Sequence, residues 1–118
     1  MTAPLLGLMA ATFLLPWANP GLASTGKTTQ MLASWYGSYF HGRTTANGEV
    51  YSMYGNTVAH KTLPFNTKLR ICYKGCVDVR VTDRGPYWGG RELDLSYGAA
   101  QAIGMVDVGV ADVDVTFL

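Results

Sequence analysis

Short runs of alternating apolar and polar residues, separated by glycine-rich turns, constrain the fold of this chain most strongly. The two clearest runs cover residues 68–72 and 77–82. Because Gly75 lies in the short turn between them, this pair predicts a β-hairpin. Further strands are predicted at residues 31–36, 57–60, 91–95 and 112–117.

The rest of the pattern favours a closed barrel. Residues 97–103 predict one short helix, because Ser96 can cap its start and Gly104 can end it. Residues 37–54 and 83–90 are rich in turn-forming residues and predict loops. Six short strands and one helix in a chain of 118 residues predict a mainly β fold, a small barrel whose closure removes exposed strand edges.

The N-terminus differs from the rest of the chain in charge. All nine Lys and Arg and all eight Asp and Glu residues lie from Lys27 onward. Residues 3–18 are almost entirely apolar, yet they are fewer than the roughly 20 that a membrane-spanning helix requires. Helix-breaking residues follow, and the small residues Gly21 and Ala23 fit a cleavage site after Ala23. This segment predicts a secretory signal peptide, with a buried N-terminal helix or an uncleaved anchor as the alternatives.

The predicted organisation has three parts: a signal peptide at 1–23, a flexible N-terminus at 24–30 and one barrel domain at 31–118. We expect no stable membrane insertion after the signal peptide is removed, and an exported monomer in the periplasm, the extracellular space or the cell wall. The formal net charge of +1 gives no basic surface, which argues against nucleic acid as a partner.

Cys72 and Cys76 flank the predicted hairpin turn. Across so tight a turn their Cβ atoms can come within reach of a disulfide, which an oxidising compartment favours. A zinc site with His41 or His60 is the first alternative, but the two histidines have no short-range ligand spacing. Free thiols packed as small apolar groups are the second. No metal site is predicted.

Six segments, taken in order, resemble the rare lipoprotein A (RlpA) family of peptidoglycan lytic transglycosylases. They are Ala33-Ser-Trp-Tyr-Gly37, Phe40-His-Gly-Arg43, Thr45-Ala-Asn-Gly-Glu49, Ala59-His-Lys-Thr-Leu-Pro-Phe65, Asp83-Arg-Gly-Pro86 and Leu93-Asp-Leu-Ser96. The resemblance implies a six-stranded double-psi β-barrel, a fold shared with expansins. One departure is Thr82, where the family usually has Asn before the Asp-Arg-Gly-Pro segment.

The resemblance also implies which residues carry the chemistry. Asp83 is the implied main catalytic acid, and Glu49 and His60 are implied to share its cleft. Asp94 corresponds to a functionally important Asp of expansin-like barrels, which makes it a candidate second carboxylate. From the residues alone, each of these side chains has a structural alternative. Asp83 can accept hydrogen bonds from its own turn, and Asp94 can bond the start of the following helix. Glu49 can be a solvated loop charge, and His60 can be a structural histidine with its hydrogen bonds satisfied.

Sugar binding favours flat aromatic faces and fork-shaped hydrogen-bond donors. The candidates for substrate binding are Trp35, Tyr36, Tyr87, Trp88 and Arg84. Because Trp35 and Tyr36 are adjacent on one predicted strand, their side chains point to opposite faces, and at most one of them lines a given cleft.

The predicted function is that of an exported endolytic transglycosylase acting on peptidoglycan glycan strands. It would cut between N-acetylmuramic acid and N-acetylglucosamine, in strands that lack peptide stems, and leave 1,6-anhydro ends without any cofactor. The muramic acid's own 6-hydroxyl closes the anhydro ring, so fewer carboxylates are needed than in a hydrolase. The alternative is an expansin-like module that binds and loosens wall polysaccharide without cutting it.

Overall fold

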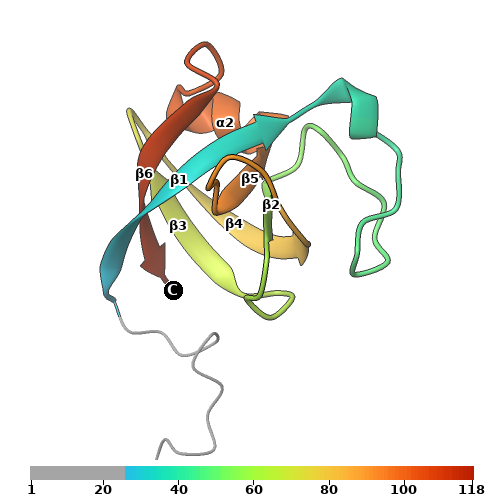
Figure 1. Cartoon of the computed structure of the whole chain (residues 1–118), viewed down its shortest axis with the longest axis horizontal. Coiled ribbons are helices and arrows are strands. Elements are labelled where there is room, and N and C mark those ends of the chain that lie inside the picture. Colours follow the sequence, from blue (N-terminus) through green and yellow to red (C-terminus); the bar gives the residue numbers. More distant parts are fainter. Residues whose placement is uncertain (1–25) are drawn as a thin grey trace, which may run out of the picture.

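Six β-strands form a closed barrel in the computed structural model, which describes residues 26–118 (Figure 1). The strands are β1 (Thr28–Tyr36), β2 (Thr57–His60), β3 (Lys68–Cys72), β4 (Cys76–Asp83), β5 (Leu93–Ser96) and β6 (Val110–Phe117). Two short helices accompany them in this part of the chain, the 3-10 helix η2 (Ser38–Phe40) and the α-helix α2 (Tyr97–Ile103).

The order of the strands around the barrel is β1-β5-β2-β4-β3-β6. Two neighbouring pairs, β1 with β5 and β2 with β4, are parallel. The other four pairs are antiparallel. This arrangement confirms the predicted six-stranded double-psi β-barrel with one short α-helix.

Alternation along the strands fills the interior of the barrel with apolar side chains. The largest of these buried strand side chains are Val58, Leu69, Ile71, Val81, Leu93, Leu95, Val113 and Val115. Since successive residues of a strand point to opposite faces, the residues between them lie on the outer face. Asp78 of β4 and Asp94 of β5 lie on this outer face, and the irregularity at Thr82, where the register of β4 with β2 shifts, brings Asp83 to the same face.

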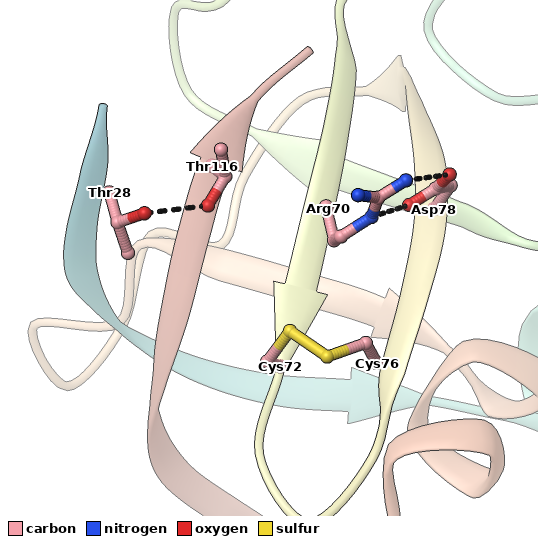
Figure 2. Close-up of a disulfide and its surroundings, with 6 residues drawn as sticks. All are labelled: Thr28, Arg70, Cys72, Cys76, Asp78 and Thr116. Carbon is pink, nitrogen blue, oxygen red and sulfur yellow. Dashed lines mark hydrogen bonds and ion pairs between the residues drawn. A yellow bond between two sulfur atoms is a disulfide. The ribbon is translucent and has the colours of Figure 1, made fainter. Parts of the chain in front are cut away.

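The β3–β4 hairpin and its disulfide confirm the prediction. Cys72 and Cys76 are register partners at the end of the hairpin, and a disulfide joins them (Figure 2). Because each sulfur bonds the other, neither the zinc site nor the pair of free thiols is formed. Arg70 and Asp78 pair across the same two strands through two hydrogen bonds of 2.7 and 3.0 Å (Figure 2).

Helix α2 begins and ends where the sequence predicts. The Ser96 hydroxyl accepts a hydrogen bond from the Ala99 N–H, and Gly104 ends the helix in the left-handed conformation with a φ of 76°. The hairpin turn packs against this end of α2, since the Gly75 N–H donates to the Ile103 carbonyl over 3.2 Å.

The start of the barrel differs from the prediction. The sequence predicts a flexible segment over residues 24–30, but β1 begins at Thr28 and pairs with β6 from that residue onward. The residues added to the strand are polar and show no alternation, and their structure comes from bonding to β6. The hydroxyls of Thr28 and Thr116 lie 2.8 Å apart (Figure 2). The predicted signal peptide lies outside the described residues, and no helix within residues 26–118 is long and apolar enough to span a membrane.

Residues 37–56, the long connection between β1 and β2, project from one side of the barrel as a lobe (Figure 1). The Tyr51 hydroxyl donates to the Tyr36 carbonyl over 2.7 Å, which ties the lobe to the end of β1. The Gly98 N–H donates to the Met53 carbonyl, also over 2.7 Å, which ties it to α2. A Cβ atom at Gly98 would lie 2.8 Å from a lobe carbonyl oxygen, so this contact requires glycine.

Candidate active site

A row of residues crosses four strands on the outer face of the barrel, beside the lobe. Ser34 lies opposite Asp94, Asp94 opposite Ala59, and Ala59 opposite Asp83. Paired residues on neighbouring strands point to the same face, so these side chains lie together. We call them the aspartate row. The Cα atoms of Asp83 and Asp94 are two strand spacings apart, about 10 Å, with only a methyl side chain between them.

Asp94 is a half-buried carboxyl of the row. The Ser34 hydroxyl donates to Asp94 Oδ1 over 2.9 Å, and Arg91 Nη1 donates to the Ser34 hydroxyl over the same distance. Burial raises the pKa of Asp94; the Ser34 hydrogen bond and the Arg91 charge oppose this rise, and the charge of Asp83 adds to it. The other oxygen, Oδ2, makes no hydrogen bond within residues 26–118, so it is available to a substrate.

Asp83 is the last residue of β4, one residue beyond the predicted end of that strand. Its Oδ1 accepts hydrogen bonds of 2.9 Å from the N–H groups of Arg84 and Ala46. The first bond is local, as the structural alternative predicts, while the second joins β4 to the lobe. Asp83 Oδ2 has no hydrogen-bond partner in the described part of the chain. Each aspartate therefore has one oxygen fixed and one free.

Tyr36 lies beside both carboxylates, and its ring is already packed. The ring stacks on Tyr51 with centroids 4.5 Å apart and meets the edge of Phe40 at 5.6 Å. Burial first, then the charges of Asp83 and Asp94, raises the pKa of the Tyr36 hydroxyl. Because its faces are covered and its hydroxyl is buried without a hydrogen-bond partner in residues 26–118, the predicted role of Tyr36 in substrate binding has no support from its position.

Trp35 occupies the opposite face of β1, as alternation predicts. Its ring packs against the core and meets Tyr97 edge-on at 5.4 Å, and its indole N–H donates to the Val106 carbonyl over 3.2 Å. This environment is that of a packing residue. The predicted role of Trp35 in substrate binding therefore has no support from its position.

Glu49 is held by Arg80 rather than by the aspartate row. Two hydrogen bonds of 2.6 and 2.8 Å join their side chains, and Asn47 donates a third to the same carboxylate over 2.8 Å. The bonds from Arg80 lower the pKa of Glu49. Glu49 is thus an ionised, ion-paired group, which does not suit a proton donor.

His60 faces its own turn. Its Nδ1 accepts hydrogen bonds from the N–H groups of Thr62 and Leu63 over 3.1 and 3.0 Å. Burial, followed by the charge of Lys61, lowers the pKa of the ring. His60 is neutral with its proton on Nε2, so it can donate one hydrogen bond from that nitrogen.

The loop after β4 offers aromatic surface. The side chains of Tyr87 and Trp88 are 67% and 77% exposed, which leaves both rings free to meet a ligand. Arg91 Nε donates to the Trp88 carbonyl over 3.0 Å and holds the loop backbone. Arg84 is engaged elsewhere, since its guanidinium lies 3.9 Å above the ring of Phe65 and bonds the His60 carbonyl.

Sequence reasoning missed two members of this site, Ser34 and Arg91. The alternation on β1 puts Ser34 on the outer face, but its contact with Asp94 depends on the parallel pairing of β1 with β5. Arg91 reaches Ser34 across fifty-seven positions in sequence, and no local pattern marks it. Within residues 26–118, no three His, Cys, Asp or Glu side chains form a group that could hold a metal ion.

The family match and the curated relatives of this chain point to the same protein family. Residues 28–115 match the family described as lytic transglycolase. A curated protein of Vibrio cholerae named endolytic peptidoglycan transglycosylase RlpA is 50% identical over 100 residues, which cover 80% of this chain and 36% of that protein. A protein of the same name from Helicobacter pylori strain J99 is 44% identical over 100 residues, covering 82% of this chain and 32% of the relative. The chain thus spans about a third of these relatives' length.

Solved structures give the same fold. A Streptomyces papain inhibitor has a TM-score of 0.63 and 20% identity, covering 79% of this chain and 96% of the inhibitor. The apo expansin of Clavibacter michiganensis also has a TM-score of 0.63, with 25% identity, covering 78% of this chain and 50% of the expansin. The inhibitor match concerns the fold alone.

Proposed function

The chain belongs to the lytic transglycolase family, and on that premise we propose that it cleaves peptidoglycan glycan strands as an endolytic transglycosylase. The observation that carries this proposal is the aspartate row, in which Asp83 and Asp94 flank Ala59 and each keeps one oxygen free. The names of the curated relatives support the same activity. The scissile bond is the one between C1 of N-acetylmuramic acid and the oxygen of the next N-acetylglucosamine.

The reaction begins with proton donation from Asp94. Burial favours the neutral form of this carboxyl, which is the form that a general acid requires. As the proton reaches the glycosidic oxygen, the bond from that oxygen to C1 breaks and positive charge develops on the muramic acid ring. The carboxylate of Asp83, whose Oδ1 is fixed by two N–H groups, stabilises this charge.

The 6-hydroxyl of the same muramic acid then attacks C1. Its oxygen forms the new bond to C1, its proton passes to Asp83, and the 1,6-anhydro ring closes. Solvent exchange returns one proton to Asp94 and removes one from Asp83, so no water is consumed. This division gives the acid role to Asp94 and the base role to Asp83, whereas the resemblance implies Asp83 as the acid.

The remaining residues position the substrate. Tyr87 and Trp88 supply exposed rings on which sugars stack. Tyr36, whose hydroxyl is buried, packs beside the reacting carboxylates. His60 holds the turn after β2 and presents one N–H. The protein acts after export to the cell wall, as a monomer whose partner is the glycan strand. It uses no cofactor and binds no nucleic acid.

Mass spectrometry of the products tests the function. The purified protein is incubated with glycan strands freed of their peptide stems, and the new ends are identified. Ends of 1,6-anhydro-muramic acid support a transglycosylase, while new reducing ends identify a hydrolase. Binding without cleavage, at any pH and with any wall source, contradicts the proposal and favours the expansin-like alternative. The similarity to the Clavibacter expansin is the observation that supports this alternative.

A further inference from the structure

We propose that the space between the lobe and the barrel is a binding pocket for a neutral, hydroxyl-rich group, namely one N-acetylglucosamine ring of the glycan. This inference rests on the proposed function. The pocket has a volume of about 260 Å³. Its lining comes from the lobe and from β2 and β4, and includes Glu49, Tyr51, Ser52, Thr57, Arg80 and Thr82.

The floor of the pocket is the outer face of two parallel strands. Thr57 of β2 lies opposite Arg80 of β4. Thr82 follows Arg80 by two positions, while Val81 between them is buried in the barrel interior. Alternation turns the side chains of Thr57 and Arg80 toward the lobe, and Thr82 joins them in the pocket lining at the irregularity where the register of β2 with β4 shifts.

Two hydroxyls on this floor have unmet hydrogen-bonding capacity. Thr82 is 2% exposed, and its Oγ1 makes no hydrogen bond within residues 26–118. The buried Thr57 Oγ1 lies near the Tyr36 hydroxyl without completing a hydrogen bond to it. A buried hydroxyl without a partner is unfavourable, so a ligand that bonds these groups gains affinity from them.

Charge decides the class of ligand. The carboxylate of Glu49 and the guanidinium of Arg80 neutralise each other through two hydrogen bonds, and Arg80 also donates to Asn66 Oδ1 over 3.1 Å. A pocket with a paired charge and free hydroxyls suits alcohol and amide groups and does not suit an anion or a cation. N-acetylglucosamine is neutral and carries hydroxyl and amide groups, whereas muramic acid carries a lactyl carboxylate for which the paired Arg80 is not free.

The pocket lies directly beside the proposed reaction centre. Thr82 is followed in the chain by Asp83, and the lobe N–H of Ala46 donates to Asp83 Oδ1. A sugar held in the pocket is therefore a neighbour of the sugar that reacts. The geometry points to a subsite that fixes the register of the strand, so that a muramic acid meets Asp83 and Asp94.

Binding of a tetrasaccharide of β-1,4-linked N-acetylglucosamine tests the pocket. Amide chemical shifts are followed in the wild type, in Thr82→Val, and in the control Thr116→Val, whose hydroxyl pairs with Thr28 on β1. Thr82→Val should weaken binding about fivefold, the effect of one lost hydrogen bond. Its melting temperature should not fall, because valine replaces an unpartnered buried hydroxyl by a methyl of similar size. Thr82→Ser keeps the hydroxyl and should retain affinity.

The inference is overturned if Thr82→Val binds as tightly as the wild type, or if shifts occur only around Tyr87 and Trp88. If Thr82→Val does not fold, Thr57→Val gives the same comparison from the other strand. Cleavage of denuded strands is measured in parallel. If Thr82→Val cleaves normally and binds as the wild type does, only the proposed pocket is contradicted. If binding depends on Thr82 but the wild type cleaves no strands, only the proposed activity is contradicted.

Discussion

Asp83 and Asp94 stand on the two strands that flank β2, and each lies opposite the same small residue, Ala59. Their sequence separation is eleven positions, but the parallel pairing of β2 with β4 and the antiparallel pairing of β2 with β5 bring them to one outer face. Ser34 fixes one oxygen of Asp94, and backbone N–H groups fix one oxygen of Asp83. The barrel thus presents two carboxylates in defined orientations with a methyl group between them.

Ala59→Val should reduce the rate of strand cleavage about tenfold or more, because two added methyl groups occupy the space between the reacting carboxylates. Some destabilisation, about 1–3 kcal/mol, is expected from overpacking. The rate is measured as the release of 1,6-anhydro ends, with folding checked by circular dichroism. Ala59→Ser, which is almost the size of alanine, serves as the control and should keep most of the activity. Full activity in Ala59→Val would mean that substrate does not pass between Asp83 and Asp94.

Ser34→Ala should shift the alkaline limb of the pH–rate profile to higher pH. The Ser34 hydroxyl donates to Asp94 and lowers its pKa, so its loss lets burial raise that pKa further and keeps the acid protonated at higher pH. The maximal rate should fall about tenfold as the carboxyl loses its orientation. Ser38→Ala, at an exposed position of η2, is the control. An unchanged limb would show that Asp94 is not the titrating acid.

Glu49→Gln should lower the melting temperature at neutral pH but not in acid. The pKa of Glu49 is lower in the folded protein than in the unfolded chain, because Arg80 bonds the carboxylate. Its stabilising contribution is therefore present above the unfolded pKa, about 4.3, and is lost as the pH falls through the lower folded pKa. Thermal melts of both proteins between neutral and acidic pH give the difference. Asp112→Asn removes an exposed charge of β6 and controls for net charge; a gap that persisted at the lowest pH would contradict the ion-pair explanation.

Replacing both cysteines, Cys72→Ser with Cys76→Ser, should cost about 2 kcal/mol of unfolding free energy, because the disulfide closes a short loop. Strand cleavage should remain at the wild-type rate. Cys76 and Asp83 are the two ends of β4, about 23 Å apart at the usual rise per residue. Urea denaturation measures the first effect and product release the second. A large loss of cleavage in the folded variant would show that the hairpin end and the reaction centre are coupled.

Much of the fold was predictable because its signals are local. The alternation of residues 68–72 and 77–82 predicts the hairpin and its disulfide, and Ser96 with Gly104 delimits α2 correctly. The polar start of β1 was not predictable, since residues 28–30 form a strand only through pairing with β6. A local signal was absent there, and a tertiary contact decided the structure.

The candidate site was predictable in its residue types more than in its contacts. The motif resemblance selects both aspartates, but their common neighbour Ala59 and the contacts of Ser34 and Arg91 depend on strand order. Glu49 and His60 were selected in the same way. Their partners, Arg80 for one and the turn N–H groups for the other, arise from the docking of the lobe and the geometry of a turn.

The most direct test of the account compares cleavage of denuded glycan strands by Asp83→Asn, Asp94→Asn and the double variant. Asp114→Asn, an exposed carboxylate of β6, is the matched control. The account predicts that either single substitution abolishes formation of 1,6-anhydro ends while glycan binding and folding persist, and that the control cleaves at the wild-type rate. Formation of anhydro ends by the folded double variant would contradict it.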